Sequence, residues 1–128
     1  ADGYGESIPT YIKQFPKNMR WVYIRAKVIA SDWTKQESKN DFILDECITY
    51  ETFCNEVLDI DSIEENAILI FTSPSSVECY KKRFSFSPKN TLIAIGKTTK
   101  KSLEGPFEVY LSPEQSVEAS LKLAKSLI

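Results

Sequence analysis

The sequence predicts an α/β protein in which helices flank a mostly parallel β-sheet. Residues 67–71 and 92–95 are almost continuously apolar, and such runs are typical of strands buried on both faces. Each run leads through a short loop of small or hydroxyl-bearing residues into a helical pattern. Strand, loop and helix in repeated order is the pattern of parallel α/β folds.

The first half of the chain has a weaker pattern. Residues 6–15 place apolar side chains at helical spacing behind a serine and a proline, which predicts a helix. The β-branched and aromatic residues 21–26 predict a strand, and residues 42–52 predict another that is long enough to change direction. Between these strands, residues 27–41 are largely polar, and we expect a short helix or a loop there.

The second half of the chain is more regular. Residues 55–66 are acidic and predict a loop or a short helical connection. The elements expected after it are a strand at 67–71, a helix through 77–84, a strand at 92–95, a helix from 98 to about 103, a strand at 107–111 and a helix from about 116 onward. The last helix carries its apolar residues on one face, as a helix packed on a sheet requires.

The composition excludes several classes of function. Of the 128 residues, 42% are hydrophobic and 27% are charged, which suffices for one ordinary domain with a buried core. The chain has no histidine, which excludes Ser-His-Asp and Cys-His catalysis and any metal site built on two histidines. A net charge of -2 does not suggest binding to nucleic acid or to a membrane surface, where basic residues are expected in excess.

The cysteines Cys47, Cys54 and Cys79 are odd in number and form no C-x-x-C pair. We interpret them as reduced, partly buried thiols rather than a disulfide framework, and we favour core packing over reactivity for Cys47 and Cys79. No apolar run approaches the ~18 residues of a membrane span, and the start of the sequence lacks the features of a signal peptide. These observations predict a cytoplasmic location without a membrane partner.

Hydroxyl-bearing residues follow two of the predicted strands. The carboxyl ends of parallel strands meet at one edge of a sheet, which is where such folds bind ligands. The candidate binding residues are Ser73, Ser75, Ser76, Gly96, Lys97, Thr98 and Thr99. Their hydroxyls, the lysine and the exposed backbone amides suit a carboxylate or a phosphate. Alternatively, the hydroxyls only cap helices and the lysine only faces solvent, and the residues alone leave both interpretations open.

The triplet Gly96-Lys97-Thr98 is not a nucleotide-binding P-loop. The motif G-x-x-x-x-G-K-[ST] needs a glycine five positions before Gly96, where this chain has Thr91. Residues 92–95 are also strand-like rather than a loop that could wrap phosphates. The sequence therefore argues against a nucleoside-triphosphate hydrolase.

Tyr50 is a further candidate, at the end of the second predicted strand and at the boundary between the two halves. Its phenol could donate a hydrogen bond or a proton to a substrate. A tyrosine at a strand end more often has a structural role. Position alone does not separate the two interpretations.

Taken in order, four segments resemble the C-terminal half of the uroporphyrinogen-III synthases. They are WVYIRA at 21–26, ITYET at 48–52, IFTSPSSV at 70–77 and AIGKTT at 94–99. The chain departs from the family at Ala26, where a glycine is frequent, and at Lys97, where a proline is frequent. Neither departure removes a proposed contact, and Lys97 could add a partner for a carboxylate.

The resemblance implies two flavodoxin-like α/β lobes that are joined by a two-stranded linker and hold the substrate between them. Residues 1–49 would be the C-terminal part of lobe two, residues 50–58 the linker strand and connection, and residues 59–128 the C-terminal part of lobe one. Members of the family are considerably longer than this chain. We therefore expect the sequence to be part of a longer enzyme and to be inactive on its own.

The resemblance also implies an activity, the cyclisation of hydroxymethylbilane to uroporphyrinogen III in haem and other tetrapyrrole biosynthesis. Water is lost and the last pyrrole ring is inverted. Tyr50 would assist departure of the hydroxyl group, and the seven loop residues would hold substrate carboxylates. No metal or organic cofactor and no nucleic-acid partner is implied. The full-length enzyme would be a monomer, and the fragment could pair with a second copy by exchanging strands or helices.

An alternative is a non-catalytic flavodoxin-like module that binds an anionic small molecule at the same loops. A generic module has no need for Tyr50 and both hydroxyl-bearing loops in this order. The ordered set of segments therefore favours the enzyme over the module.

Overall fold

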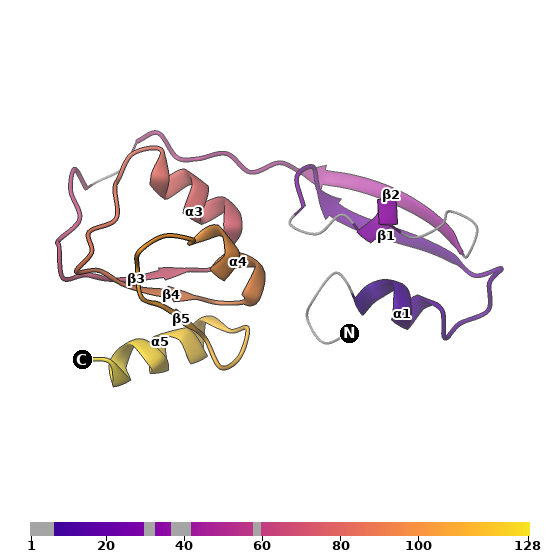
Figure 1. Ribbon diagram of the computed structural model, residues 1–128. Helices are drawn as coiled ribbons and strands as arrows, with labels where there is room; N and C mark the ends of the chain where they lie inside the picture. The colour runs from indigo at the N-terminus through magenta and orange to yellow at the C-terminus, as the bar shows by residue number, and fades with distance from the viewer. Residues whose placement is uncertain (1–6, 30–32, 37–41, 58–59) are drawn as a thin grey trace. The chain divides into compact units, whose positions relative to one another are not determined.

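A computed structural model describes residues 7–29, 33–36, 42–57 and 60–128 (Figure 1). The chain divides into two compact units, Ala1–Phe53 and Cys54–Ile128, and each is described by itself. The first contains a two-stranded parallel sheet and the second a three-stranded parallel sheet. Both units carry helices as well, so the predicted α/β class with parallel strands is confirmed.

The first unit consists of α1 (Ile8–Ile12), β1 (Arg20–Ala26), α2 (Trp33–Gln36) and β2 (Ile43–Tyr50). The strands β1 and β2 are parallel over their whole length. Arg25 lies opposite Ile48, but the next residue, Ala26, lies opposite Tyr50, so β2 has one extra residue just before Tyr50. Bulges of this kind are frequent beside functional sites, where they re-aim a side chain.

Aromatic residues on one face of β1 build the core of the first unit. Trp33 of α2 is only 2% exposed, and its ring centroid lies 5.0 Å from that of Tyr23. The opposite face of β1 presents Val22 and Ile24, which are 62% and 66% exposed. Successive side chains of a strand point to opposite faces, which explains the contrast.

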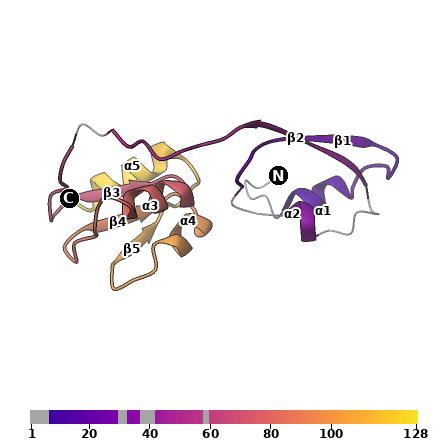
Figure 2. The same ribbon diagram turned by 90° about the horizontal axis from the view of Figure 1, so that it is seen from above.

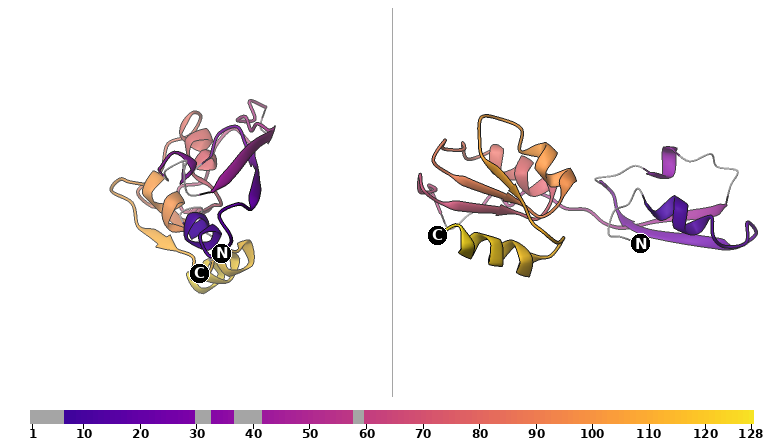
Figure 3. Two further views of the ribbon diagram at one scale, coloured as in Figure 1. Left: turned by 90° about the vertical axis from the view of Figure 1, so that its right-hand side faces the viewer. Right: turned by 60° about the horizontal axis from the view of Figure 1, so that its bottom comes forward.

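The second unit alternates strands and helices: β3 (Ile68–Phe71), α3 (Pro74–Lys81), β4 (Thr91–Ala94), α4 (Lys97–Ser102), β5 (Val109–Leu111) and α5 (Val117–Ser126). The strands lie in the order β3-β4-β5. Helices α3 and α4 cover one face of the sheet and α5 covers the opposite face (Figure 2 and Figure 3). This is the layered arrangement of an open α/β sheet.

The core of the second unit is built around the central strand β4. Leu92, Ile93 and Ala94 are completely buried, as the continuous apolar sequence of this strand predicted. An aromatic cluster extends the core, and in it the ring of Phe71 lies 5.5 Å from that of Tyr80. The sheet is therefore held from both faces, and its loops project from a rigid scaffold.

A buried amide joins the amino ends of β3 and β4. The Nδ2 atom of Asn90 donates to the carbonyl oxygens of Glu64 (3.0 Å) and Glu65 (2.9 Å). Its Oδ1 atom accepts a hydrogen bond from the backbone N–H of Ser87 (2.9 Å). Asn90 is 5% exposed, so water does not compete well for these bonds. The side chain thereby fixes the segments that enter both strands.

The predicted elements of the second unit are confirmed, with ends displaced by a few residues. The strand predicted at 42–52 does not change direction, because β2 runs parallel to β1 from Ile43 to Tyr50 with only the bulge before Tyr50. The helix predicted at 6–15 is shorter, since it ends at Ile12 and the chain then turns towards Pro16. A proline disfavours helical geometry in the residue before it.

Two sequence predictions extend beyond the described residues. Of the short helix or loop predicted at 27–41, the structure contains α2, and residues 30–32 and 37–41 lie outside the described ranges. The connection predicted at 55–66 has neither helix nor strand in its described part, and residues 58–59 lie outside it. The prediction of an irregular connection holds for that part.

The interpretation of the cysteines as reduced, partly buried thiols is wrong for Cys54 and Cys79, and for Cys47 it is right about the free thiol but wrong about burial. Cys54 and Cys79 form a disulfide across 25 positions of sequence. The two cysteines meet because the folded chain brings α3, which carries Cys79, beside Cys54. Their spacing in the sequence does not reveal this. Arg83 contributes to this path, because its guanidinium donates to the carbonyl oxygen of Glu56 (3.2 Å). Cys47 is a free thiol but is exposed rather than packed in a core.

Candidate functional site

Three loops meet at the carboxyl edge of the second sheet, because β3, β4 and β5 are parallel neighbours. They connect β3 to α3, β4 to α4 and β5 to α5. The sequence predicted the first two as binding loops and did not single out the third. Ligands of open α/β sheets bind at this edge.

The β3–α3 loop uses most of its hydroxyls to begin the helix. The Oγ of Ser73 accepts from the backbone N–H of Ser76 (3.1 Å), and the Oγ of Ser76 accepts from the backbone N–H of Ser73 (3.3 Å). This reciprocal pair is a capping box. Ser75 is exposed, and its Oγ lies 3.0 Å from that of Ser73. The capping interpretation therefore describes Ser73 and Ser76, while Ser75 and the hydroxyl of Ser73 still reach the loop surface.

The β4–α4 loop is organised differently. Gly96 occupies the cap position of α4, and no side chain caps the helix. Thr98 and Thr99 therefore do not spend their hydroxyls on the helix end, as the alternative interpretation of this loop would require. Lys97 is exposed, Thr98 is half-buried and Thr99 is 3% exposed.

The hydroxyl of Thr99 is the most enclosed polar group of this loop. It makes no hydrogen bond to any residue of the described ranges. Within those ranges, the sealed side-chain polar atoms that lack a partner are Trp33 Nε1 and the Tyr80 hydroxyl, so the Thr99 oxygen keeps access to solvent. A hydroxyl that has no partner among the described residues and remains open to solvent is available to bind an anionic oxygen.

The β5–α5 loop places Gln115 against the second loop. A Cβ atom built on Gly96 would lie 2.6 Å from Nε2 of Gln115. The loop itself is fixed at both ends, because Ser112 Oγ donates to the carbonyl oxygen of Glu114 (2.7 Å) and Ser116 Oγ accepts from Ala119 N–H (3.1 Å). The signal was present in the sequence, since a Ser-Pro pair follows a strand here as it does at Ser73.

Tyr50 ends β2 in the first unit, next to the bulge. Its carbonyl oxygen accepts a hydrogen bond from the backbone N–H of Lys27 (2.9 Å), and its side chain is 59% exposed. Arg25 fixes the neighbouring end of β1, because its Nη1 donates to the carbonyl oxygens of Ala26 (2.9 Å) and Lys27 (3.1 Å). The backbone that carries Tyr50 is therefore held in place while its phenol remains free to meet a ligand.

The predicted site residues thus fall into two groups. One group lies at two neighbouring loops of the second unit and in the first turns of the helices that follow them: Ser73, Ser75, Ser76, Gly96, Lys97, Thr98 and Thr99. Tyr50 belongs to the first unit. The residues that sequence reasoning missed are Gln115 at the sheet edge and Arg25 beside Tyr50.

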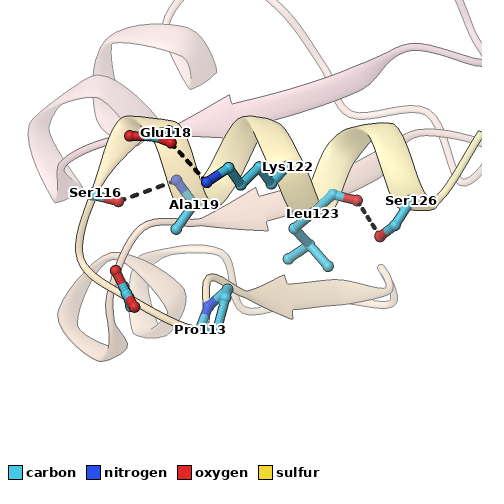
Figure 4. Close-up of a pocket in the computed structure, with 8 residues that line it drawn as sticks. Pro113, Ser116, Glu118, Ala119, Lys122, Leu123 and Ser126 are labelled. Carbon is cyan, nitrogen blue, oxygen red and sulfur yellow. Dashed lines mark hydrogen bonds and ion pairs between the residues drawn. The ribbon is translucent and has the colours of Figure 1, made fainter.

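Other features of the described residues do not enlarge this site. A hollow of about 410 Å³ lies on α5 and the loop before it, where Glu118 pairs with Lys122 (Figure 4). None of the predicted site residues lines it. In the ranges that the structure describes, no group of acidic or cysteine side chains could hold a metal ion. No helix in those ranges has the length and apolar character needed to cross a membrane.

The fold and the loops define an α/β protein with open parallel sheets whose carboxyl edge suits an anionic ligand. A family model described as uroporphyrinogen-III synthase HemD (HEM4) matches residues 1–122. The chain belongs to this uroporphyrinogen-III synthase family.

A solved structure supports the same assignment. The uroporphyrinogen-III synthetase from Helicobacter pylori 26695 is similar to this chain with 28% sequence identity and a TM-score of 0.73. The similarity covers 97% of this chain and 59% of that chain, so this chain spans less than two thirds of the solved protein. No curated protein sequence matches the chain.

Proposed function

We propose that the protein is a uroporphyrinogen-III synthase, a lyase that cyclises hydroxymethylbilane to uroporphyrinogen III in tetrapyrrole biosynthesis. The observation that carries this proposal is the family match over residues 1–122. The polar loops at the carboxyl edge of the second sheet support it, because the substrate carries acetate and propionate carboxylates on its pyrrole rings.

The loops of the second unit would hold substrate carboxylates. Thr99 offers a shielded hydroxyl, Thr98 a second hydroxyl and Lys97 an exposed ammonium group. The hydroxyl of Ser75 and the backbone of Gly96 complete the two loops. Hydrogen bonds to an ionised carboxylate are stronger than those between neutral groups. Such contacts hold a flexible linear tetrapyrrole without requiring a large positive charge.

Tyr50 would act on the departing group. In the reaction the C–O bond of the hydroxymethyl carbon breaks, and the oxygen leaves as water after gaining a proton. A hydrogen bond from the Tyr50 phenol to that oxygen would stabilise its departure. The resulting electrophilic carbon then forms a C–C bond with the substituted carbon of the last ring. The bond from that ring carbon to its existing methylene bridge breaks, and the bridge forms a new bond to the unsubstituted α-carbon of the same ring. That α-carbon loses its proton, so the macrocycle closes with the last ring inverted.

Most of the catalytic effect would come from positioning. An open chain has many conformations, and holding its two ends together removes the entropic cost of finding the reactive one. We further propose that residues 1–49 and 59–128 belong to two lobes of the whole enzyme, with residues 50–58 as the linker. The two compact units, which meet between Phe53 and Cys54, are compatible with this division.

The activity assay uses the natural gene product that carries this sequence, with this chain alone in parallel. Hydroxymethylbilane is supplied, and the type I and type III isomers are separated after oxidation. We expect the type III isomer from the gene product and no measurable activity from the chain alone. Formation of only the type I isomer, which arises spontaneously, would contradict the proposal and favour a non-catalytic module that binds anions.

Two substitutions test the proposed roles. Tyr50→Phe should lower kcat by about a hundredfold, because a proton donor is lost. Tyr11→Phe, another exposed tyrosine of the first unit, is the matched control. Thr99→Val should raise KM by about tenfold by removing a hydrogen bond to a charged group, while Thr99→Ser should retain the wild-type value. Equal values for the valine and serine variants would remove Thr99 from the site.

The expected compartment is also a proposal. We propose that the protein acts in the cytoplasm, where disulfides are rare. The disulfide between Cys54 and Cys79 should then be largely reduced in growing cells and should form in the isolated protein under oxidising conditions. Rapid alkylation of thiols in intact cells tests this, and a fully oxidised pair would contradict a cytoplasmic location.

We propose that the whole enzyme is a monomer and that this chain alone associates with a second copy by exchanging strands or helices. Exposed apolar residues on the first sheet support association, with Val22 62% and Ile24 66% exposed. Solution scattering of both proteins at several concentrations measures their mass. A chain that stays monomeric at all concentrations contradicts exchange.

A further inference from the structure

One side chain at the carboxyl edge of the second sheet has no role in the function proposed above. Gln115 is exposed in the β5–α5 loop, and its Nε2 atom lies against the backbone of Gly96 in the neighbouring loop. Its amide makes no hydrogen bond to any residue in the described ranges. An amide with two free N–H donors therefore faces the loop that carries Thr99.

We infer that Gln115 is a substrate-contact residue that donates a hydrogen bond to an acetate or propionate carboxylate held at the β4–α4 loop. This inference rests on the proposed function. It adds a third loop to a site that the sequence described with two. Two observations support the inference: the Gln115 amide lies against Gly96, and the buried residue Thr99 is three positions after Gly96.

The position of the Gln115 amide depends on the glycine at residue 96. The backbone of Gly96 is extended, with φ of -157°, a conformation that any residue adopts. A side chain at this position would therefore change the position of Gln115 rather than the backbone. A Cβ atom at this position would lie 2.6 Å from the Gln115 amide and would displace that side chain. Glycine leaves the amide in place above the loop.

A neutral donor suits this position for a chemical reason. A carboxylate has two oxygens and accepts several hydrogen bonds, so it can bind Thr99, Lys97 and Gln115 together. Lysine attracts any anion at long range, whereas an amide acts only at hydrogen-bond distance. Gln115 would therefore favour a carboxylate that lies within hydrogen-bond distance of its amide, while Lys97 would attract anions electrostatically.

The experiment measures binding of uroporphyrin III, the stable oxidised form of the product, to the natural gene product by fluorescence. Gln115→Ala should weaken binding about tenfold, and Gln115→Glu should weaken it further because two carboxylates repel each other. Gln115→Lys should restore binding, since it supplies a donor again. Glu114→Ala is the matched control, because Glu114 is exposed in the same loop and its described hydrogen bonds use only its backbone carbonyl oxygen.

Gly96→Ala provides an independent test, because it displaces the Gln115 amide without altering residue 115. It should weaken binding about as much as Gln115→Ala does. The double variant should bind no more weakly than either single variant, since both remove the same contact. Thermal unfolding should be nearly unchanged in all variants, because the affected side chain is exposed.

The outcomes separate this inference from the proposed function. If the wild-type protein forms uroporphyrinogen III and Gln115→Ala binds uroporphyrin III as tightly as the wild type, Gln115 is not a contact residue and the proposed function stands. Additive effects of Gly96→Ala and Gln115→Ala would also overturn the inference. A wild-type protein without synthase activity overturns the proposed function, and this inference with it.

Discussion

Individual buried polar atoms show where the packing of this protein is incomplete. The hydroxyl of Tyr80 is sealed within the aromatic core of the second unit and has no hydrogen-bond partner among the described residues. Its ring stacks on Phe86 with centroids 4.8 Å apart. An unsatisfied buried hydroxyl costs free energy that the ring contacts must offset. Burial also raises the pKa of the Tyr80 phenol.

Tyr80→Phe should therefore stabilise the second unit by about 1 kcal/mol at neutral pH, because it removes an unsatisfied hydroxyl and keeps the ring. Because the pKa of Tyr80 is higher in the folded state than in the unfolded state, the folded wild type favours the protonated phenol. The stability from this preference is fully present below the unfolded pKa of about 10 and is lost as the pH rises through the folded pKa. The stability difference between Tyr80→Phe and the wild type should therefore grow as the pH rises from about 10 to the folded pKa. Urea unfolding across the pH range measures both effects, and a destabilised variant would mean that the hydroxyl has a partner.

At the residue scale, the sequence singles out residues that stand in a recognisable pattern and misses contacts that depend on the folded chain. Thr99 and Tyr50 are predicted as site residues because each ends or follows a strand in a recognisable segment, and their roles remain predictions. Gln115 is one polar residue in a loop, and only its contact with Gly96 distinguishes it. The Cys54–Cys79 pair was missed for the same reason, since the two residues meet only through the path of the folded chain.

At the scale of elements, the two helices at the candidate site begin in contrasting ways. Helix α3 begins with the reciprocal Ser73–Ser76 capping box, whereas α4 begins at a glycine without a side-chain cap. The hydroxyls of Ser73 and Ser76 are therefore used in capping, whereas those of Thr98 and Thr99 make no cap hydrogen bond. Sequence could not divide these roles, because both loops are rich in hydroxyls.

Ser73→Ala should lower the stability of the second unit by about 1 kcal/mol, because it removes the cap of α3. Ser75→Ala is the matched control, since Ser75 is exposed and lies outside the reciprocal pair. Chemical unfolding monitored by circular dichroism measures the difference. If Ser73→Ala instead leaves stability intact and weakens uroporphyrin binding, Ser73 serves the ligand rather than the helix.

The elements themselves were predictable in proportion to their burial. The fully buried β4 appears in the sequence as an uninterrupted apolar run, and its position was predicted to within one residue. The strand β2 is exposed along most of its length, so its sequence lacks a clear period and its course was misjudged. A strand that is buried on both faces needs an apolar sequence, which can be recognised. The course of an exposed strand depends on the neighbouring strand with which it pairs, and its own sequence does not show this.

At the scale of the whole molecule, the disulfide has the greatest effect on the chain. It joins the segment directly after the first unit to α3 in the second. Arg83 adds hydrogen bonds to the carbonyl oxygens of Glu56 (3.2 Å) and Ile60 (3.4 Å) on the same segment. The segment that follows the first unit is therefore attached to the second unit by a covalent bond and by hydrogen bonds.

Reduction of this disulfide should destabilise the second unit by about 3 kcal/mol, because the unfolded chain gains the conformational freedom of a loop of this length. The unfolding midpoint in urea should fall when a reductant is added to the wild type. It should not respond in a Cys54→Ser/Cys79→Ser variant, while Cys47→Ser should behave as the wild type. Three titratable thiols in the folded, untreated protein would show that the bond does not form.

The residues at the amino and carboxyl edges of the second sheet differ in burial and in their contacts. At the amino edge, the side chain of Asn90 hydrogen-bonds to four backbone groups that lead into neighbouring strands, and a change there should destabilise the unit. At the carboxyl edge, Gln115 and Lys97 are exposed, and changes there should leave the fold intact. Amino-acid substitutions can therefore accumulate at the carboxyl edge while the residues of the amino edge are kept. Relatives with altered ligand preference could arise by loop changes alone, without any intermediate that fails to fold.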